Sequence, residues 1–141
     1  MEKIDPKTYI GIDYGLTNIG VAMGRNGLVV PIKVIAGKSE SEAIHEITRI
    51  AMENNAVKIV VGLPLSSQGK ETQQSLKTRK FAKLLKIFTK KPVELYDEHS
   101  STKEALSEAI STGISQKHRG IKDHLSAALI LKRYFSIIET N

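Results

Sequence analysis

The chain has 141 residues, of which 40% are hydrophobic and 26% are charged, as expected for one soluble globular domain. It contains no cysteine, which excludes a disulfide framework, a thiolate metal site and a cysteine nucleophile. The formal net charge of +6 favours a polyanionic partner, most simply a nucleic acid, although surface charge also serves solubility alone. We find no apolar signal segment or run of membrane-spanning length, so we expect a soluble cytoplasmic protein with no membrane partner.

The first 36 residues predict three short strands joined as antiparallel hairpins. The dipeptide Asn26-Gly27 suits the positive φ angles of a tight turn between the second and third strands. Pro31 lies inside the third strand and cannot donate to a ladder, so we expect that strand at a sheet edge or at a bulge. The three strands are Tyr9–Ile12, Gly20–Met23 and Leu28–Ile35.

The remainder alternates helical and strand patterns. Ser39 with Glu42, and Ser101 with Glu104, have the spacing of helix capping boxes. The expected elements are a helix after Ser39, a strand Val57–Pro64, a helix Glu71–Thr89, a strand Pro92–His99, a helix Ser101–Thr112 and a last helix from near Ile121. A hairpin meander followed by βα units predicts one α/β domain over residues 1–141, with a mixed five-stranded sheet and helices on both faces.

Acidic residues stand at the ends of two predicted strands and at the start of the last helix. Asp13 ends the first strand, Asp97 and Glu98 end the fifth, and Asp123 lies in the first turn of the final helix. If these carboxylates converge, their mutual repulsion requires a bound cation, and oxygen-only ligands suit Mg²⁺ or Mn²⁺. A pair of such ions activates water against a phosphodiester.

Each acid also has a simpler interpretation. Asp123 alone is favoured near a helix N-terminus by the macrodipole, and Asp97 and Glu98 suit an ordinary turn. Asp13 is harder to explain in this way, because it follows a buried strand and precedes Gly15, where the backbone can turn tightly.

The helix Glu71–Thr89 carries a one-sided basic stripe. Its members are spaced four, three and four residues apart. The opposite face of the helix is apolar and is expected to pack on the sheet through Phe81, Leu84, Leu85 and Phe88. Solvated helix faces usually mix charges, so we interpret the stripe as a contact for a phosphate backbone. Its members are Arg79, Lys83, Lys86 and Lys90.

A second basic patch, "KHRGIK", immediately precedes Asp123 and would suit a site that admits a polyanion. Its cations are Lys117, Arg119 and Lys122. His99 follows the acidic pair and either positions a phosphate or water or makes a local hydrogen bond. His45 has the pattern of a structural residue. Ser66, Ser67 and Gln68 are either substrate-binding or plain loop residues.

Four segments in this order resemble the YqgF family, also called RuvX, of ribonuclease H-like nucleases. They are "GIDYGLTNIGVA", "IVVGLPLSSQGKETQQ", "VELYDEHSST" and "KDHLSAALILKRYF". The resemblance runs from Tyr9 to about Phe135. It implies a ribonuclease H-like fold and a cation-dependent nuclease site.

By position, the resemblance assigns Asp13, Glu98 and Asp123 as catalytic metal ligands, with Asp97 as a further candidate and Gly15 and His99 in secondary roles. It implies processing of the 5′ end of pre-16S rRNA, or resolution of Holliday junctions, with pre-rRNA, branched DNA or ribosomal precursor particles as partners. The sequence distinguishes neither substrate, nor a monomer from a homodimer.

The chain departs from the family pattern at two places. Leu16, Thr17 and Asn18 stand where the family usually has Gly-Thr and basic residues, and His99 replaces an arginine. These changes keep open a third role, a non-catalytic RNA-binding assembly factor. The glycine-rich start also resembles the phosphate loop of the actin and sugar-kinase superfamily, but those proteins need two such domains around a cleft.

Overall fold

The computed structural model describes residues 7–36, 39–97 and 119–139, and in the last segment it describes side chains from Ser126 to Ile138. Glu98, His99 and Lys117, and the helix predicted over Ser101–Thr112, lie outside the described residues.

The core is a mixed five-stranded sheet in the order β3-β2-β1-β4-β5. β1 pairs with β2, and β2 with β3, in antiparallel fashion, whereas β4 is parallel to β1 and β5 is parallel to β4. This confirms the predicted meander and βα units. The strands are β1 (Thr8–Tyr14), β2 (Asn18–Arg25), β3 (Leu28–Ala36), β4 (Ala56–Leu63) and β5 (Val93–Asp97).

Pro31 lies on an edge strand and beside a bulge. β3 is the outermost strand, and its register with β2 shifts, so that Val21 pairs with Lys33 while Ala22 pairs with Pro31. Ile32 is the extra residue between these pairs. Both explanations predicted for Pro31 therefore hold, because an edge and a bulge each remove the need for its missing N–H.

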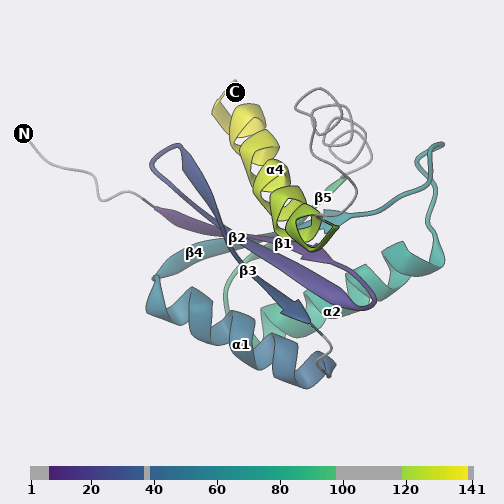
Figure 1. Cartoon of the computed structure of the whole chain (residues 1–141), viewed down its shortest axis with the longest axis horizontal. Coiled ribbons are helices and arrows are strands. Elements are labelled where there is room, and N and C mark those ends of the chain that lie inside the picture. Colours follow the sequence, from purple (N-terminus) through teal and green to yellow (C-terminus); the bar gives the residue numbers. More distant parts are fainter. Residues whose placement is uncertain (1–6, 37–38, 98–118, 140–141) are drawn as a thin grey trace, which may run out of the picture.

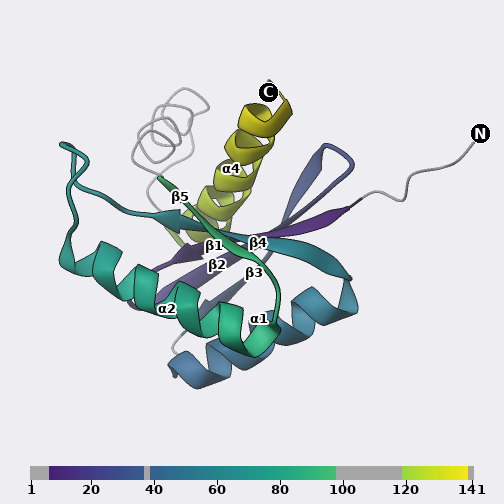
Figure 2. The ribbon, with the colours of Figure 1, turned by 180° about the vertical axis from the view of Figure 1, so that it is seen from behind.

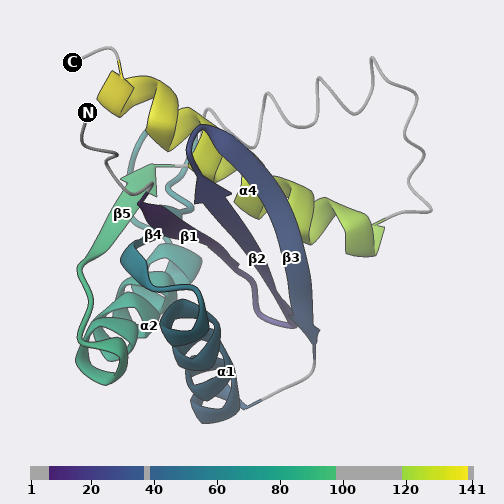
Figure 3. The same cartoon turned by 90° about the vertical axis from the view of Figure 1, so that its left-hand side faces the viewer.

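Helices cover both faces of the sheet, as Figures 1, 2 and 3 show. α1 (Glu40–Glu53) and α2 (Gln73–Thr89) lie on one face, and α4 (Arg119–Glu139) lies on the other. α2 begins at Gln73, two residues later than predicted, because Thr72 and Ser75 form a reciprocal capping box. α4 begins at Arg119, earlier than the predicted Ile121, so Arg119 belongs to the first turn of the helix rather than to the preceding loop. Lys122 lies in the same turn.

Two apolar layers hold these helices to the sheet. The larger layer joins the sheet to α1 and α2 and includes the fully buried Ile12, Ile59 and Phe81. The smaller layer lies under α4 and includes Val60 and Tyr134. β4 is buried on both faces, as its continuous apolar run predicts for a central parallel strand.

α4 lies unusually close to β1 and β2 because glycines face it. A Cβ added at Gly11 would lie 3.0 Å from the carbonyl oxygen of Ala127. One added at Gly24 would lie 2.4 Å from Cε2 of Phe135 and 2.9 Å from Cδ2 of Leu131. Even one methyl group at these positions would push the helix or its side chains away from the sheet.

We expect Gly24→Ala to lower the free energy of unfolding by about 1–3 kcal/mol, because the added methyl overpacks the contact with Phe135. Urea denaturation measures this change. Combining Gly24→Ala with Phe135→Leu should cost less than the sum of the two single changes, since the shorter side chain frees part of the space. A Gly24→Ala variant as stable as the wild type would contradict this account of the packing.

Candidate active site at the carboxyl edge of the sheet

Asp13 is partly buried near the carboxyl end of β1 and lies on the α4 face. Along β1, side chains alternate between the two faces. Ile10 and Ile12 pack in the layer beneath α1 and α2, whereas Tyr9 packs against Phe135 of α4 with ring centroids 5.1 Å apart. Asp13 is four residues after Tyr9 on the same strand, so its side chain lies on the same face of the sheet as that of Tyr9.

The start of α4 lies level with Asp13. The helix runs antiparallel to β1, because its later residue Phe135 meets Tyr9 while Ala127 lies over Gly11. Asp123 precedes Ala127 by four residues, about 6 Å of helix, and Asp13 follows Gly11 by two residues, about 6.6 Å of strand. The backbone of Asp123 is therefore near the same end of the sheet, although it is the fifth residue of α4 and not in the first turn as predicted.

Asp97 ends β5 as predicted, but it lies on the other face of the sheet. Its neighbours Val93 and Leu95 pack in the α1–α2 layer, and Tyr96 packs in the α4 layer. By this alternation Asp97, which is exposed, lies on the α1–α2 side, away from the face of Asp13. This placement does not favour Asp97 as a ligand beside Asp13. Among the residues with described side chains, no group of three or more acids or histidines is placed to hold a metal ion.

Gly15 closes the turn that follows Asp13. Its N–H donates to the carbonyl oxygen of Asn18 at 3.0 Å, and a Cβ at Gly15 would lie 2.5 Å from that oxygen. This supports the predicted role of Gly15 in a tight turn. Leu16 and Thr17, at the tip, are exposed.

Tyr14 is held from the opposite face by α2, a contact that sequence reasoning missed. The side-chain amide of Gln74 donates to the carbonyl oxygen of Tyr14 at 3.0 Å, and Phe81 stacks on the Tyr14 ring with centroids 4.4 Å apart. Burial, and then the negative charge of Glu40, raise the pKa of the Tyr14 phenol, so it stays neutral at physiological pH. α2 thus fixes the backbone immediately after Asp13.

The loop after β4 reaches the same edge and is ordered from within. The Ser66 hydroxyl accepts hydrogen bonds from the N–H groups of Gln68 and Lys70, at 3.3 and 3.0 Å. The hydroxyl of Thr72 donates to the carbonyl oxygen of Pro64 at 3.2 Å. Ser66 therefore stabilises the loop itself. This favours the interpretation of Ser66 as an ordinary loop residue over that of a substrate-binding residue.

The predicted basic stripe lies on α2, on the face of the sheet away from Asp13. Its lysines are exposed, but Arg79 is bound by Glu71 through two hydrogen bonds of 2.8 Å. These bonds lower the pKa of the Glu71 carboxyl and raise that of the Arg79 guanidinium. The prediction that Phe88 packs on the sheet is wrong, because its side chain is 61% exposed beside α1.

The patch before Asp123 is described only in part. The backbones of Arg119 and Lys122 lie in the first turn of α4, at the end of the helix that is level with Asp13. His45, predicted as structural, is exposed on α1.

Comparison with known proteins matches the chain to one family over nearly its whole length. The model of the family described as "RuvX: Holliday junction resolvase" matches residues 7–137. The chain belongs to the RuvX family. This confirms the predicted family and identifies the chain as a member of a family of nucleases.

Curated RuvX relatives resemble the chain over most of both sequences. A Rickettsia canadensis protein named "Putative pre-16S rRNA nuclease" is 32% identical and covers 92% of this chain and 86% of its own. A Corynebacterium jeikeium protein of the same name is 33% identical and covers 93% and 91%. No helix among the described residues is long and apolar enough to cross a membrane.

The fold is similar to that of solved resolvases. The structure of Thermus thermophilus RuvC in complex with a Holliday junction substrate matches with a TM-score of 0.60 and 14% identity, over 93% of this chain and 96% of that one. The ribonuclease H-like, mixed α/β fold predicted from the sequence is therefore confirmed.

Replacing Gln74 with leucine removes the donor to the Tyr14 carbonyl while keeping the side-chain volume. We expect the free energy of unfolding to fall by about 1 kcal/mol and nucleic-acid cleavage to fall about tenfold, because the backbone beside Asp13 loosens. Denaturation and single-turnover cleavage measure the two effects. Gln73→Leu, on the exposed neighbouring residue, is the matched control. Equal cleavage by both variants and wild type would show that this hydrogen bond does not position the site.

Proposed function

We propose that this RuvX protein is a divalent-metal-dependent endonuclease that cleaves phosphodiester bonds in structured nucleic acid. The observation that carries the proposal is the placement of Asp13, partly buried at the carboxyl edge of β1 and level with the backbone of Asp123 on α4. An acid in a partly buried position beside the start of a helix that also carries an acid suits a bound cation.

The donor set fits Mg²⁺ or Mn²⁺. Asp13 supplies carboxylate oxygens at this edge, and the family resemblance assigns Glu98 and Asp123 to the same site. Hard divalent cations prefer such oxygen ligands, and a chain without cysteine offers no thiolate alternative. When bound, the ions would activate a water molecule and stabilise the leaving oxygen.

The chain's own residues would orient this chemistry. Asp13 would hold the metal position on a strand whose end is fixed by Gln74 and by the Gly15 turn. The first turn of α4, with Arg119 and Lys122, would attract the phosphate backbone to the same edge. In the proposed single domain over residues 1–141, the basic stripe lies on the face of the sheet away from Asp13. Its residues, Arg79, Lys83, Lys86 and Lys90, would contact only a substrate that extends around the sheet to that face.

We propose pre-16S rRNA as the first substrate, with cleavage at its 5′ end in the cytoplasm, because the relatives at 32–33% identity are named for that RNA. Ribosomal precursor particles would be the partners. Holliday junction DNA is the second candidate, because it is the substrate in the description of the matching family.

The decisive pair of variants is Asp13→Asn and Asp97→Asn. We expect Asp13→Asn to reduce Mg²⁺-dependent cleavage by at least 10³-fold with folding intact, because a metal-binding carboxylate is lost. Asp97→Asn should retain cleavage within about threefold, because Asp97 lies on the other face of the sheet. Each variant and the wild type are assayed with Mg²⁺, Mn²⁺ or chelator.

Two labelled substrates are compared side by side, a pre-16S rRNA with its 5′ leader and a four-way DNA junction. Cation-dependent cutting of only one substrate would assign the substrate class. Full activity of Asp13→Asn would refute the proposed site. Salt-sensitive RNA binding without cleavage by the wild type would replace the nuclease proposal with a non-catalytic assembly role, consistent with the changes at Leu16–Asn18 and His99.

A further inference from the structure

A row of residues on the α4 face connects Asp13 with Tyr96 across the sheet. Gly62 of β4 stands next to Asp13, because the register of β1 and β4 places the two preceding residues opposite each other. Gly62 in turn pairs with Tyr96 of β5, and Tyr96 packs in the α4 layer, so all three positions face the same side. Glycine has no side chain. Within the row, nothing therefore stands between the Asp13 carboxylate and the Tyr96 ring, whose Cα atoms are two strand spacings, about 9.6 Å, apart.

Tyr96 is the aromatic residue best placed to meet a substrate at this edge of the sheet. The chain has four tyrosines, three phenylalanines and no tryptophan, and all of these rings lie in the described part of the chain. Three of them pack on one another at the amino end of β1, and a further pair stacks on the face away from Asp13. The group of three is Tyr9, Tyr134 and Phe135, and the pair is Tyr14 and Phe81.

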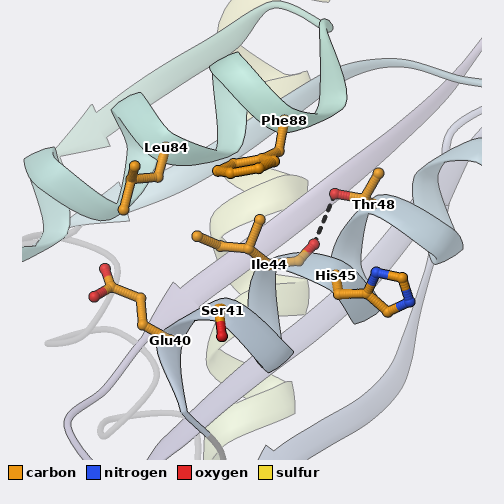
Figure 4. A pocket seen from close by; sticks show the side chains of 7 residues that line it. All are labelled: Glu40, Ser41, Ile44, His45, Thr48, Leu84 and Phe88. Atoms are coloured by element: carbon orange, nitrogen blue, oxygen red, sulfur yellow. Dashed lines mark hydrogen bonds between the residues drawn. The ribbon is translucent and has the colours of Figure 1, made fainter.

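Phe88 is well exposed, but it also lies on the face away from Asp13. With Leu84 it lines an apolar groove of about 480 Å³ between α1 and α2 (Figure 4). Glu40 stands at the same groove and would repel a phosphate backbone. Tyr96, in contrast, is partly exposed on the α4 face. It is therefore the ring that a strand bound at Asp13 would meet.

The positions around the site provide fewer cations for gripping a strand than the family pattern does. Leu16–Asn18 stand where the family usually has Gly-Thr and basic residues, and His99 stands in place of an arginine. An aromatic ring supplies a different grip, because every base has a flat face that stacks on it. Stacking of one base on such a ring is worth from about fivefold to more than a hundredfold in affinity.

We propose that Tyr96 stacks on a base next to the phosphodiester that is cleaved, and that the substrate must therefore present an unstacked nucleotide at the cleavage point. The inference rests on the proposed function and deepens it. A continuous duplex keeps each base stacked on its neighbours and offers none to the ring. The crossing of a junction, or an unpaired stretch of an RNA leader, exposes one.

The cleavage test combines a change in the protein with a change in the substrate. Tyr96→Leu removes the ring, and an abasic nucleotide beside the mapped cut, placed on either side in turn, removes the base. On one of the two sides we expect each change alone to lower kcat/KM at least fivefold. The two changes together should lower it little further, because both remove the same contact. Tyr96→Phe keeps the ring and should cleave within about twofold of the wild type.

Tyr9→Leu is the matched control, because Tyr9 is also a partly buried tyrosine of the α4 layer but lies at the opposite end of the sheet. It should lower the stability in urea as Tyr96→Leu does, yet keep the full loss that the abasic nucleotide causes. Losses that multiply when Tyr96→Leu meets the abasic substrate would overturn the proposal. Poor cleavage by Tyr96→Phe would overturn stacking and assign the phenol a hydrogen bond to the substrate instead.

A binding test separates this inference from the proposed function. The wild type and Tyr96→Leu are titrated, in chelator, with a labelled short single strand and with the same strand built of abasic units, and fluorescence anisotropy gives each Kd. We expect the wild type to bind the strand with bases at least fivefold more tightly, and Tyr96→Leu to lose this preference. A wild type that cuts no substrate would refute the nuclease proposal, and this test would still decide whether Tyr96 stacks on bases. An equal preference for bases in both proteins would overturn the inference.

Discussion

The alternation of side chains along β1 is the constraint on which the arrangement of this protein depends. The even-numbered Ile10 and Ile12 pack in the core beneath α1 and α2. The odd-numbered Tyr9, Gly11 and Asp13 lie on the face that α4 covers. A shift of register by one residue would bury the carboxylate in the larger apolar layer, where an unpaired charge is very costly. The same alternation of side chains therefore buries the apolar residues of β1 and places the Asp13 carboxylate on the α4 face.

This division gives the two faces of the sheet different side chains. The α4 face carries Asp13 and the start of the helix that bears Asp123, and its packing is tight enough to fix their relative level. The other face carries α1 and α2, with the basic stripe on α2. Tyr14 connects the two, because its carbonyl and ring are held by α2 while the preceding residue is on the α4 side.

The sequence predicted the sheet well because its signals are local. The turn at Asn26-Gly27 has the positive φ angles expected, 55° and 82°, and Pro31 located both the edge and the bulge. The predicted start of α2 was two residues too early because Thr72 caps the helix through Ser75, a pairing that the usual glutamate pattern does not reveal. At the site, Asp97 could not be placed from its position at a strand end alone, since its face depends on how the strand packs. The contact of Gln74 with Tyr14 spans 60 residues of sequence and leaves no local signal.

Because α4 lies so close to Gly24, a small change at this contact can shift the far end of the helix. Phe135, which lies against Gly24, is twelve residues from Asp123, about 18 Å along the helix axis. A tilt of about 3° about the Phe135 contact would move the start of α4 by about 1 Å, which exceeds the roughly 0.5 Å within which the residues of a metal site must be held. Small differences in side-chain volume at the far end of α4 would thus cause larger displacements at the end where we propose the active site. Sequence changes around Gly24 and Phe135 offer a way to tune activity gradually without altering any residue that meets the substrate.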